Sequence, residues 1–189
     1  MRSANVAAVV LAALTAAGCA TTGSDKKEAA VRIDKDPYPS TYQRYPGATT
    51  LIRGATVLDG EGGRIDGGEV LLADGKIVAV GRNLAADGAT VIDGTGKYVT
   101  PGIIDVHSHL GDYPSPAVAA HQDGNEATGP ARPEVWAEHS VWPQDPGFSR
   151  ALANGGITAL QILPGSANLF GGRSVTLKNV PARTMQAMK

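Results

Sequence analysis

The sequence predicts an α/β fold preceded by a small antiparallel β module. Residues 48–99 read as short strands broken by glycine turns, which is typical of an antiparallel sheet. Farther along, a short helical pattern over Phe148–Asn154 is followed by Gly155-Gly156 and the apolar run Ile157–Leu163. Because a helix, a glycine and then a buried strand is the order found in parallel sheets, we expect α/β structure after residue 100.

The β module contains one specific turn signal. Glu69–Ala73 and Lys76–Val80 flank Asp74-Gly75, a pair that favours the two-residue type I′ turn of a β-hairpin. The acidic residues of this region fall at turns, where turn chemistry explains them better than catalysis does. We therefore assign no catalytic role to Asp59, Glu61, Asp74 and Asp93.

A second apolar run carries the first chemical signal. Ile103, Ile104 and Val106 are β-branched, which favours a buried strand. His107 and His109 follow two residues apart, and alternate residues of a strand point to the same face. Two imidazoles that converge at a strand end form half of a divalent-metal site, and an accidental pair on a polar loop is the alternative.

The wider sequence around this pair resembles the signature of the amidohydrolase superfamily of metal-dependent hydrolases. The resemblance is densest in VIDGTGKYVTPGIIDVHSH, which ends at His109. It implies that His107 and His109 end the first strand of a (β/α)₈ barrel and bind one or two divalent metals, for which zinc is expected. The resemblance also implies that Asp105 orients the metal ligands without binding the metal itself. The resemblance also implies that residues 48–99 belong to a β-sandwich completed by strands from the C-terminus.

A looser resemblance covers the rest of the chain. Trp136–Ser140 and Gly171–Ser174 are similar to imidazolonepropionase-like or Xaa-Pro-dipeptidase-like amidohydrolases, which implies a small-molecule or dipeptide-like substrate. On a barrel, the long irregular region from Gly111 to Gly147 would lie at the catalytic face. His121, His139 and Arg173 are therefore candidates for substrate contact. Solvent exposure for the two histidines and a tight turn at the arginine are the simpler alternatives.

Length limits what the chain can do alone. A full barrel takes about 250 residues, so residues 100–189 can supply only two or three of its eight strands. The resemblance implies further ligands past Lys189: a carboxylated lysine or a glutamate, two histidines and an aspartate. We expect an incomplete barrel that is inactive on its own and whose runs Ile103–Val106 and Ile157–Leu163 lack their usual cover. The predicted activity is hydrolysis of a C–N bond through a metal-activated water, and the alternative is an inactive, truncated, surface-anchored lipoprotein.

The start of the chain predicts export. Arg2, the apolar run Val6–Leu14 and small residues up to Cys19 form a lipoprotein-type signal peptide over residues 1–19. The pattern departs from the usual lipobox at Ala16, where leucine is common. We expect lipidation of Cys19 and attachment to the periplasmic side of the outer membrane, with a soluble periplasmic protein as the alternative. The polar residues 20–47 read as a flexible tether.

Composition excludes several other classes of protein. The formal net charge is −1 and no long basic run occurs, so nucleic-acid binding is not indicated. The single cysteine excludes a disulfide within one chain. The sequence also has no P-loop, dinucleotide-binding fingerprint or nucleophile elbow.

Overall fold

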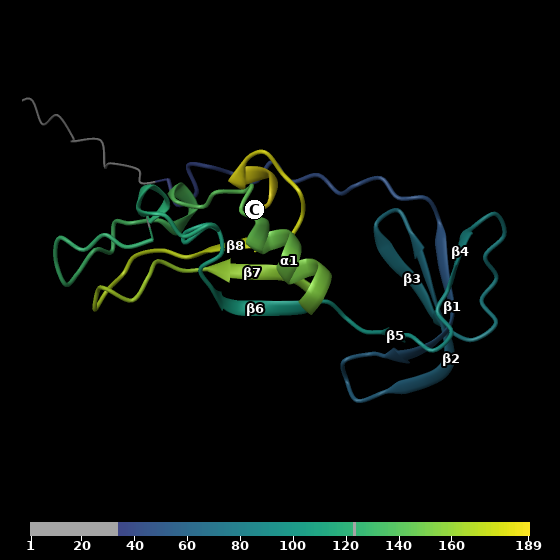
Figure 1. Ribbon diagram of the computed structural model, residues 1–189. Helices are drawn as coiled ribbons and strands as arrows, with labels where there is room; N and C mark the ends of the chain where they lie inside the picture. The colour runs from purple at the N-terminus through teal and green to yellow at the C-terminus, as the bar shows by residue number, and fades with distance from the viewer. Residues whose placement is uncertain (1–33, 123) are drawn as a thin grey trace, which may run out of the picture. The chain divides into compact units, whose positions relative to one another are not determined.

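A computed structural model describes residues 34–122 and 124–189 of the 189-residue chain. The predicted signal peptide, Cys19 and residues 20–33 of the predicted tether lie outside this part. No helix in the described ranges is long and apolar enough to cross a membrane. The strands of the described residues form two sheets, and each sheet is built from a continuous stretch of the chain (Figure 1).

The first sheet corresponds to the predicted β module, and its strand order is β3-β2-β1-β4, with β5 also paired to β1. A type I′ turn requires positive φ at both central residues, and Asp74 and Gly75 have φ of 50° and 67°. The predicted hairpin is therefore confirmed. The five strands are β1 (Thr50–Leu58), β2 (Arg64–Ala73), β3 (Lys76–Gly81), β4 (Thr90–Asp93) and β5 (Tyr98–Val99).

The prediction of a purely antiparallel module is wrong, because this sheet is mixed. β1 pairs antiparallel with β2, but β4 and β5 both pair with β1 in parallel. A two-residue hairpin turn forces antiparallel pairing, whereas a longer connection lets the chain return to the other edge of the sheet. Residues 82–89 form such a connection between β3 and β4, and turn signals alone do not reveal the direction in which the strand re-enters.

The second sheet has the order β6-β7-β8 and comes from the region predicted to be α/β. Parallel pairing of β6 with β7 confirms the pattern of strand, helix and strand. β8 instead pairs antiparallel with β7, so it does not extend the parallel pair. The elements are β6 (Ile103–Ser108), α1 (Pro146–Gly155), β7 (Ile157–Ile162) and β8 (Val175–Lys178), with short 3₁₀ turns η1 (Ala119–His121), η2 (Ala137–His139) and η3 (Met185–Ala187).

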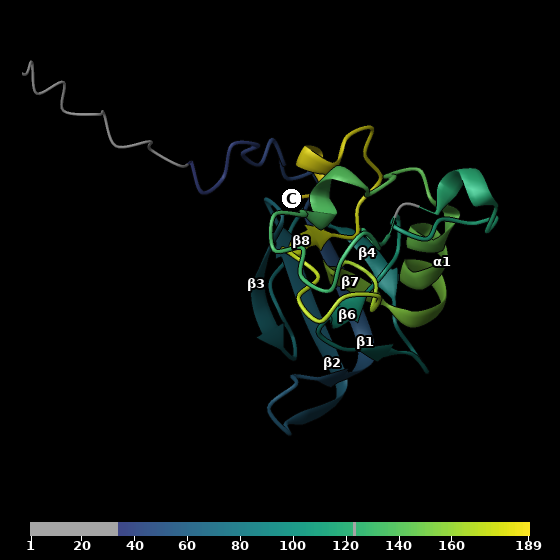
Figure 2. The same ribbon diagram turned by 90° about the vertical axis from the view of Figure 1, so that its left-hand side faces the viewer.

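Both ends of α1 are set by local sequence. The buried Asp145 carboxylate caps the N-terminus by accepting the Gly147 N–H at 2.9 Å, and Pro146 occupies the first helical turn. At the other end Gly156 adopts the left-handed conformation with φ of 63°, and its N–H bonds back to the last turn. Both views show α1 beside β7, so the helix packs on the parallel pair (Figure 1, Figure 2).

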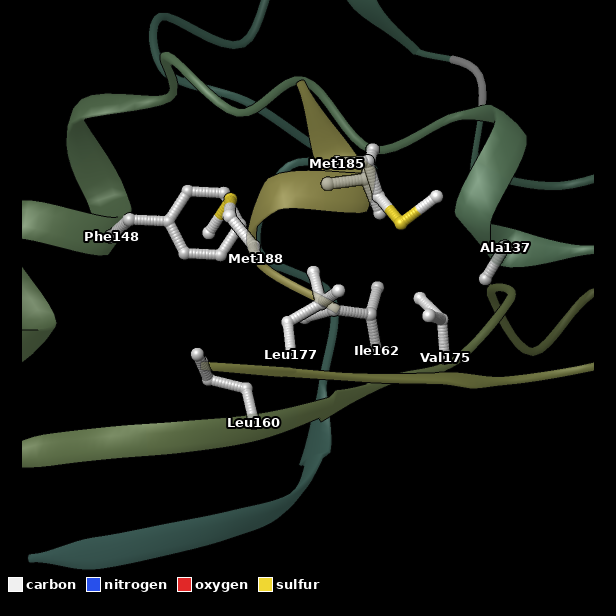
Figure 3. Close-up of a cluster of buried hydrophobic side chains, with 9 residues drawn as sticks. Ala137, Phe148, Leu160, Ile162, Val175, Leu177, Met185 and Met188 are labelled. Atoms are coloured by element: carbon white, nitrogen blue, oxygen red, sulfur yellow. The ribbon is translucent and has the colours of Figure 1, made fainter. Parts of the chain in front are cut away.

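A single apolar cluster holds the second sheet, α1 and the end of the chain together. Figure 3 shows side chains of β7 and β8 pointing toward two methionines from the C-terminal segment. Leu160, Ile162 and Met188 have no exposed surface, and Phe148 carries α1 into the same cluster. Burial of such side chains contributes about 1.5–3 kcal/mol each, which makes this cluster the main stabilising element around β7.

We expected the apolar side chains of Ile103–Val106 and of Ile157–Leu163 to be exposed, and this holds only for Ile103–Val106. Ile103, Ile104 and Val106 are 53%, 63% and 68% exposed, so the prediction of a buried strand is wrong for β6 in this chain. Within the described residues β6 lies at the edge of its sheet, next to β7 alone. Leu160 and Ile162 of β7 are instead fully buried, because α1 and the C-terminal methionines cover them.

Residues 36–45, which belong to the predicted tether, lie along the end of the chain. The Thr41 N–H donates to the Gln186 carbonyl at 2.9 Å, and the Tyr45 hydroxyl donates to the Pro181 carbonyl. The Tyr42 ring lies under the Lys178 ammonium, 5.5 Å from ring centroid to nitrogen. These long-range contacts have no local sequence signal.

Lys189 joins the same segment to the loop that precedes α1. Its ammonium donates to Asp36, to the Tyr38 carbonyl at 2.8 Å and to the buried Glu138 carboxylate at 2.8 Å. Burial alone would lower the pKa of Lys189, but its hydrogen bonds to the two carboxylates outweigh that effect and raise it. The lysine therefore stays charged and ties three parts of the chain together.

Candidate metal centre and adjoining pocket

The two histidines lie where β6 ends beside the end of β7. The last bond between the strands runs from the Leu163 N–H to the Ser108 carbonyl at 3.0 Å. The Leu163 carbonyl then accepts a hydrogen bond from His109 Nδ1 at 2.9 Å. The N–H of Leu163 is bonded to β6 and its carbonyl is bonded to His109. The imidazole of His109 is therefore fixed relative to the strand pair.

This hydrogen bond also fixes the proton on His109. A carbonyl oxygen can only accept, so Nδ1 must be the protonated nitrogen. In the neutral ring the lone pair is then on Nε2, which is the form that a metal ligand needs. A backbone partner on the second ring nitrogen is the usual arrangement for a metal-binding histidine.

His107 and His109 converge in the structure. Their ring centroids are 5.3 Å apart, and the ring planes meet at 85°. Two imidazoles at this separation can direct one nitrogen each toward a shared ion, so the pair fits a divalent metal such as zinc. No group of three or more His, Cys, Asp or Glu side chains suited to a metal occurs within residues 34–122 and 124–189.

Asp105 contacts the backbone of the pair and not its rings. Its carboxylate accepts the His107 N–H at 3.1 Å. The pairing of β6 with β7 is irregular between Asp105 and Ser108, which is the mark of a β-bulge. A bulge leaves an amide without its partner across the sheet, and the carboxylate supplies one here. Asp105 thereby stabilises the local backbone that aims His107.

The turn after β6 connects the histidines to a second group of residues. The Tyr113 ring lies edge-on to His109, with centroids 5.6 Å apart. The Tyr113 hydroxyl accepts a hydrogen bond from the Asn125 side-chain amide. The turn itself is anchored by the buried Asp145, which accepts the Gly111 N–H at 3.0 Å. The helix cap and the turn beside the histidines thus share one carboxylate.

Two of the three predicted substrate-contact residues lie together around Trp136. His139 stacks on the indole with centroids 5.9 Å apart, and Tyr38 meets the same imidazole edge-on at 5.1 Å. The Arg173 guanidinium carbon lies 4.1 Å from the Trp136 ring centroid. His139 also lines a small pocket, described below. His121 is placed differently, because it packs on Trp142 with centroids 5.2 Å apart.

The backbone of Arg173 forms an isolated parallel β-bridge with Trp136. Its N–H donates to the Val135 carbonyl at 2.7 Å, and its carbonyl accepts the Ala137 N–H at 2.9 Å. Gly172 precedes it with φ of 102° and has backbone oxygens where a side chain would stand. This bridge positions Arg173 against the loop that holds Trp136.

Sequence analysis did not identify several residues of this site. Leu163 acts through its backbone, which any residue type provides, so no signal was available. Asp145 did have a sequence signal, because an aspartate directly before a proline at a helix start is typical of an N-cap. Tyr113 and Asn125 depend on a contact between distant parts of one loop, which the sequence does not encode locally.

Comparison with known proteins finds likenesses to amidohydrolases. No family model matches it. It is 34% identical to the amidohydrolase tasK of Hapsidospora irregularis over 72% of this chain and 16% of that protein. A dihydroorotase of Pelotomaculum thermopropionicum is 32% identical over 62% of this chain and 22% of its own length. The solved structure of an amidohydrolase from Thermotoga maritima matches 74% of this chain and 36% of its own, with a TM-score of 0.68 and 38% identity.

These likenesses support the amidohydrolase superfamily for this chain, in agreement with its His-x-His motif. A D-hydantoinase of Geobacillus stearothermophilus is also 42% identical over 42% of the chain. The chain spans 16% to 22% of the length of the three curated relatives named here.

Asp105 provides a test of how the site is held. Asp105→Ala removes the acceptor for the His107 amide, and we expect zinc affinity to fall about tenfold or more, the lower end of what supporting groups at metal sites contribute. Asp105→Asn keeps a side-chain oxygen at the same position and should stay within about threefold of the wild-type affinity. Competition with a chromophoric zinc chelator measures both. Equal affinities for the alanine variant and the wild type would contradict this role for Asp105.

Proposed function

We propose that His107 and His109 are metal ligands of a hydrolase that cleaves a C–N bond in an amide, a cyclic amide or a peptide-like substrate. One observation carries the proposal: the two rings converge at 5.3 Å, and the hydrogen bond to Leu163 leaves Nε2 of His109 as the lone-pair nitrogen. The likeness to amidohydrolases, dihydroorotases and hydantoinases, which hydrolyse C–N bonds, supports the reaction class.

The roles of the chain's own residues follow from their contacts. His109 and His107 would hold the ion, and zinc is the metal that we expect. A divalent metal supplies an acidified water and an electrophile for the substrate carbonyl when it is bound. Leu163 keeps the His109 ring oriented, and Asp105 keeps the bulge in shape. A catalytic zinc normally has three protein ligands, so this pair is necessary and not sufficient.

The position of the pair supports a barrel enzyme. In (β/α)₈ barrels the active site lies at the C-terminal ends of the parallel strands. His107 and His109 lie at the C-terminal end of β6, and Leu163 follows the C-terminal end of β7. We propose that β6 and β7 are the first two strands of such a barrel. We also propose a small-molecule or dipeptide-like substrate bound by the loops after these strands.

Substitution of the histidines tests the proposed ligands. In an enzyme that has all of its metal ligands, His107→Ala and His109→Ala should each abolish stoichiometric zinc binding, because each removes one ligand from the site. His121→Ala is the matched control, since that ring packs on Trp142 and is not part of the pair. Metal analysis after gel filtration gives the zinc content, and release of amine from N-acyl amino acids, X-Pro dipeptides and cyclic amides gives the activity. Retention of metal and turnover by His107→Ala would rule out the assignment.

We further propose that the protein is exported and anchored by lipidation of Cys19. The proposal rests on the apolar run before Cys19 and on the position of this single cysteine at its end. Mass spectrometry of the mature N-terminus should find Cys19 as the first residue, with a diacylglyceryl group. Cys19→Ala should release the protein from the membrane fraction. A mature chain that starts elsewhere without lipid would leave the soluble periplasmic alternative.

A further inference from the structure

A small pocket is lined in part by Pro164, which follows the backbone partner of His109 in the chain. Its volume is about 170 Å³. Pro164, one of its lining residues, follows Leu163, whose carbonyl binds His109. Consecutive Cα atoms are about 3.8 Å apart, so the wall of the pocket and the partner of His109 are neighbours. The polar and aromatic side chains of the lining are Asn125, Glu126, Trp136, His139 and Ser140.

Ser140 offers the pocket an acceptor. Its hydroxyl oxygen lies 3.2 Å from Asp112 Oδ1 and 3.1 Å from the Ala137 carbonyl. Both neighbours are acceptors, so the single hydroxyl proton is directed to them. The remaining lone pairs of Ser140 can accept a hydrogen bond from a ligand but the residue has no second proton to donate.

Glu126 brings a negative charge to the same lining. Hydrogen bonds from the Thr128 side chain and from its N–H, at 3.0 Å, hold the pKa of Glu126 below its ordinary value, and the positive charge of Arg132 lowers it further. A carboxylate has about four acceptor positions, so two bonds from Thr128 leave capacity for a ligand. The described residues that line the pocket include neither lysine nor arginine.

Asn125 and Trp136 are engaged in other contacts. The Asn125 amide bonds to the Tyr113 hydroxyl and to the Ala167 N–H, and Trp136 has Arg173 and His139 against its ring. Asn125 also links the pocket to His109, because Tyr113 touches both. The groups left to meet a ligand are thus the Glu126 carboxylate, the Ser140 oxygen and the His139 ring, of which the carboxylate alone carries a full negative charge.

We infer that this pocket binds a protonated amino group of the substrate, held by Glu126 and Ser140. The inference rests on the proposed function, because the amide to be cleaved would then lie at His107 and His109. The ligand class is a small amide or dipeptide with a free amine. The volume of the pocket accommodates such a head group.

A pair of probes that differ in charge tests this inference. L-alaninamide carries an ammonium group, and N-acetyl-L-alaninamide is its neutral analogue. Trp136 lines the pocket, so its fluorescence reports occupancy once the second indole is removed by Trp142→Phe. In this background we expect L-alaninamide to bind and the acetylated probe to bind at least tenfold more weakly, since a hydrogen-bonded ion contributes more than a neutral contact.

Glu126→Gln should weaken L-alaninamide binding about tenfold or more, because the charge is lost while the shape is kept. Glu134→Gln is the matched control, because that carboxylate lies in the same loop, pairs with Arg132 and does not line the pocket. Ser140→Ala should also weaken the charged probe, by a smaller factor. Thermal unfolding of each variant confirms that it is folded.

Three results would overturn the inference: no binding of L-alaninamide to the parent chain, equal binding of both probes, or an unchanged affinity in Glu126→Gln. Zinc binding separates this inference from the proposed function. Glu126→Gln should retain zinc, whereas loss of zinc binding in His107→Ala concerns the metal ligands alone. An amino-group pocket without zinc binding at the histidines would therefore refute only the proposed hydrolase.

Discussion

The backbone of Leu163 is the point on which the candidate site depends. Its N–H completes the parallel pairing of β7 with β6, and its carbonyl holds the imidazole of His109. Strand pairing therefore sets both the position of the histidine and the nitrogen that bears its proton. A side-chain partner could change rotamer, whereas a carbonyl in a paired strand cannot move without breaking the sheet.

Asp145 and the apolar cluster around β7 also support the site. Asp145 caps α1 and also anchors Gly111 in the turn after β6, so helix and turn are positioned by one buried carboxylate. The apolar cluster that covers β7 includes methionines from the end of the chain. The segment 36–45 lies against that end and, through Tyr38, against His139. Distant parts of the chain thus stabilise the loops on which the pocket is built.

Local signals explain what the sequence could predict. Asp74-Gly75 specifies its hairpin, Gly156 ends α1, and the spacing of His107 and His109 places two imidazoles at one strand end. The direction of β4 and the antiparallel pairing of β8 were not predictable, because both depend on where the chain returns in space. The pocket was hidden for the same reason, since its lining combines residues 124–126, residues within 135–140 and Pro164, which only the fold brings together.

The proton position on His109 tests the central claim most directly. Long-range ¹H–¹⁵N correlation spectra of the histidine-labelled chain distinguish the two neutral tautomers at a pH where the rings are uncharged. We predict that His109 is protonated on Nδ1 and that His121, which has no carbonyl partner on its Nδ1 in the described structure, is not fixed in this form. A spectrum in which His109 carries its proton on Nε2 would contradict the account, because the nitrogen assigned to the metal would then have no lone pair to offer.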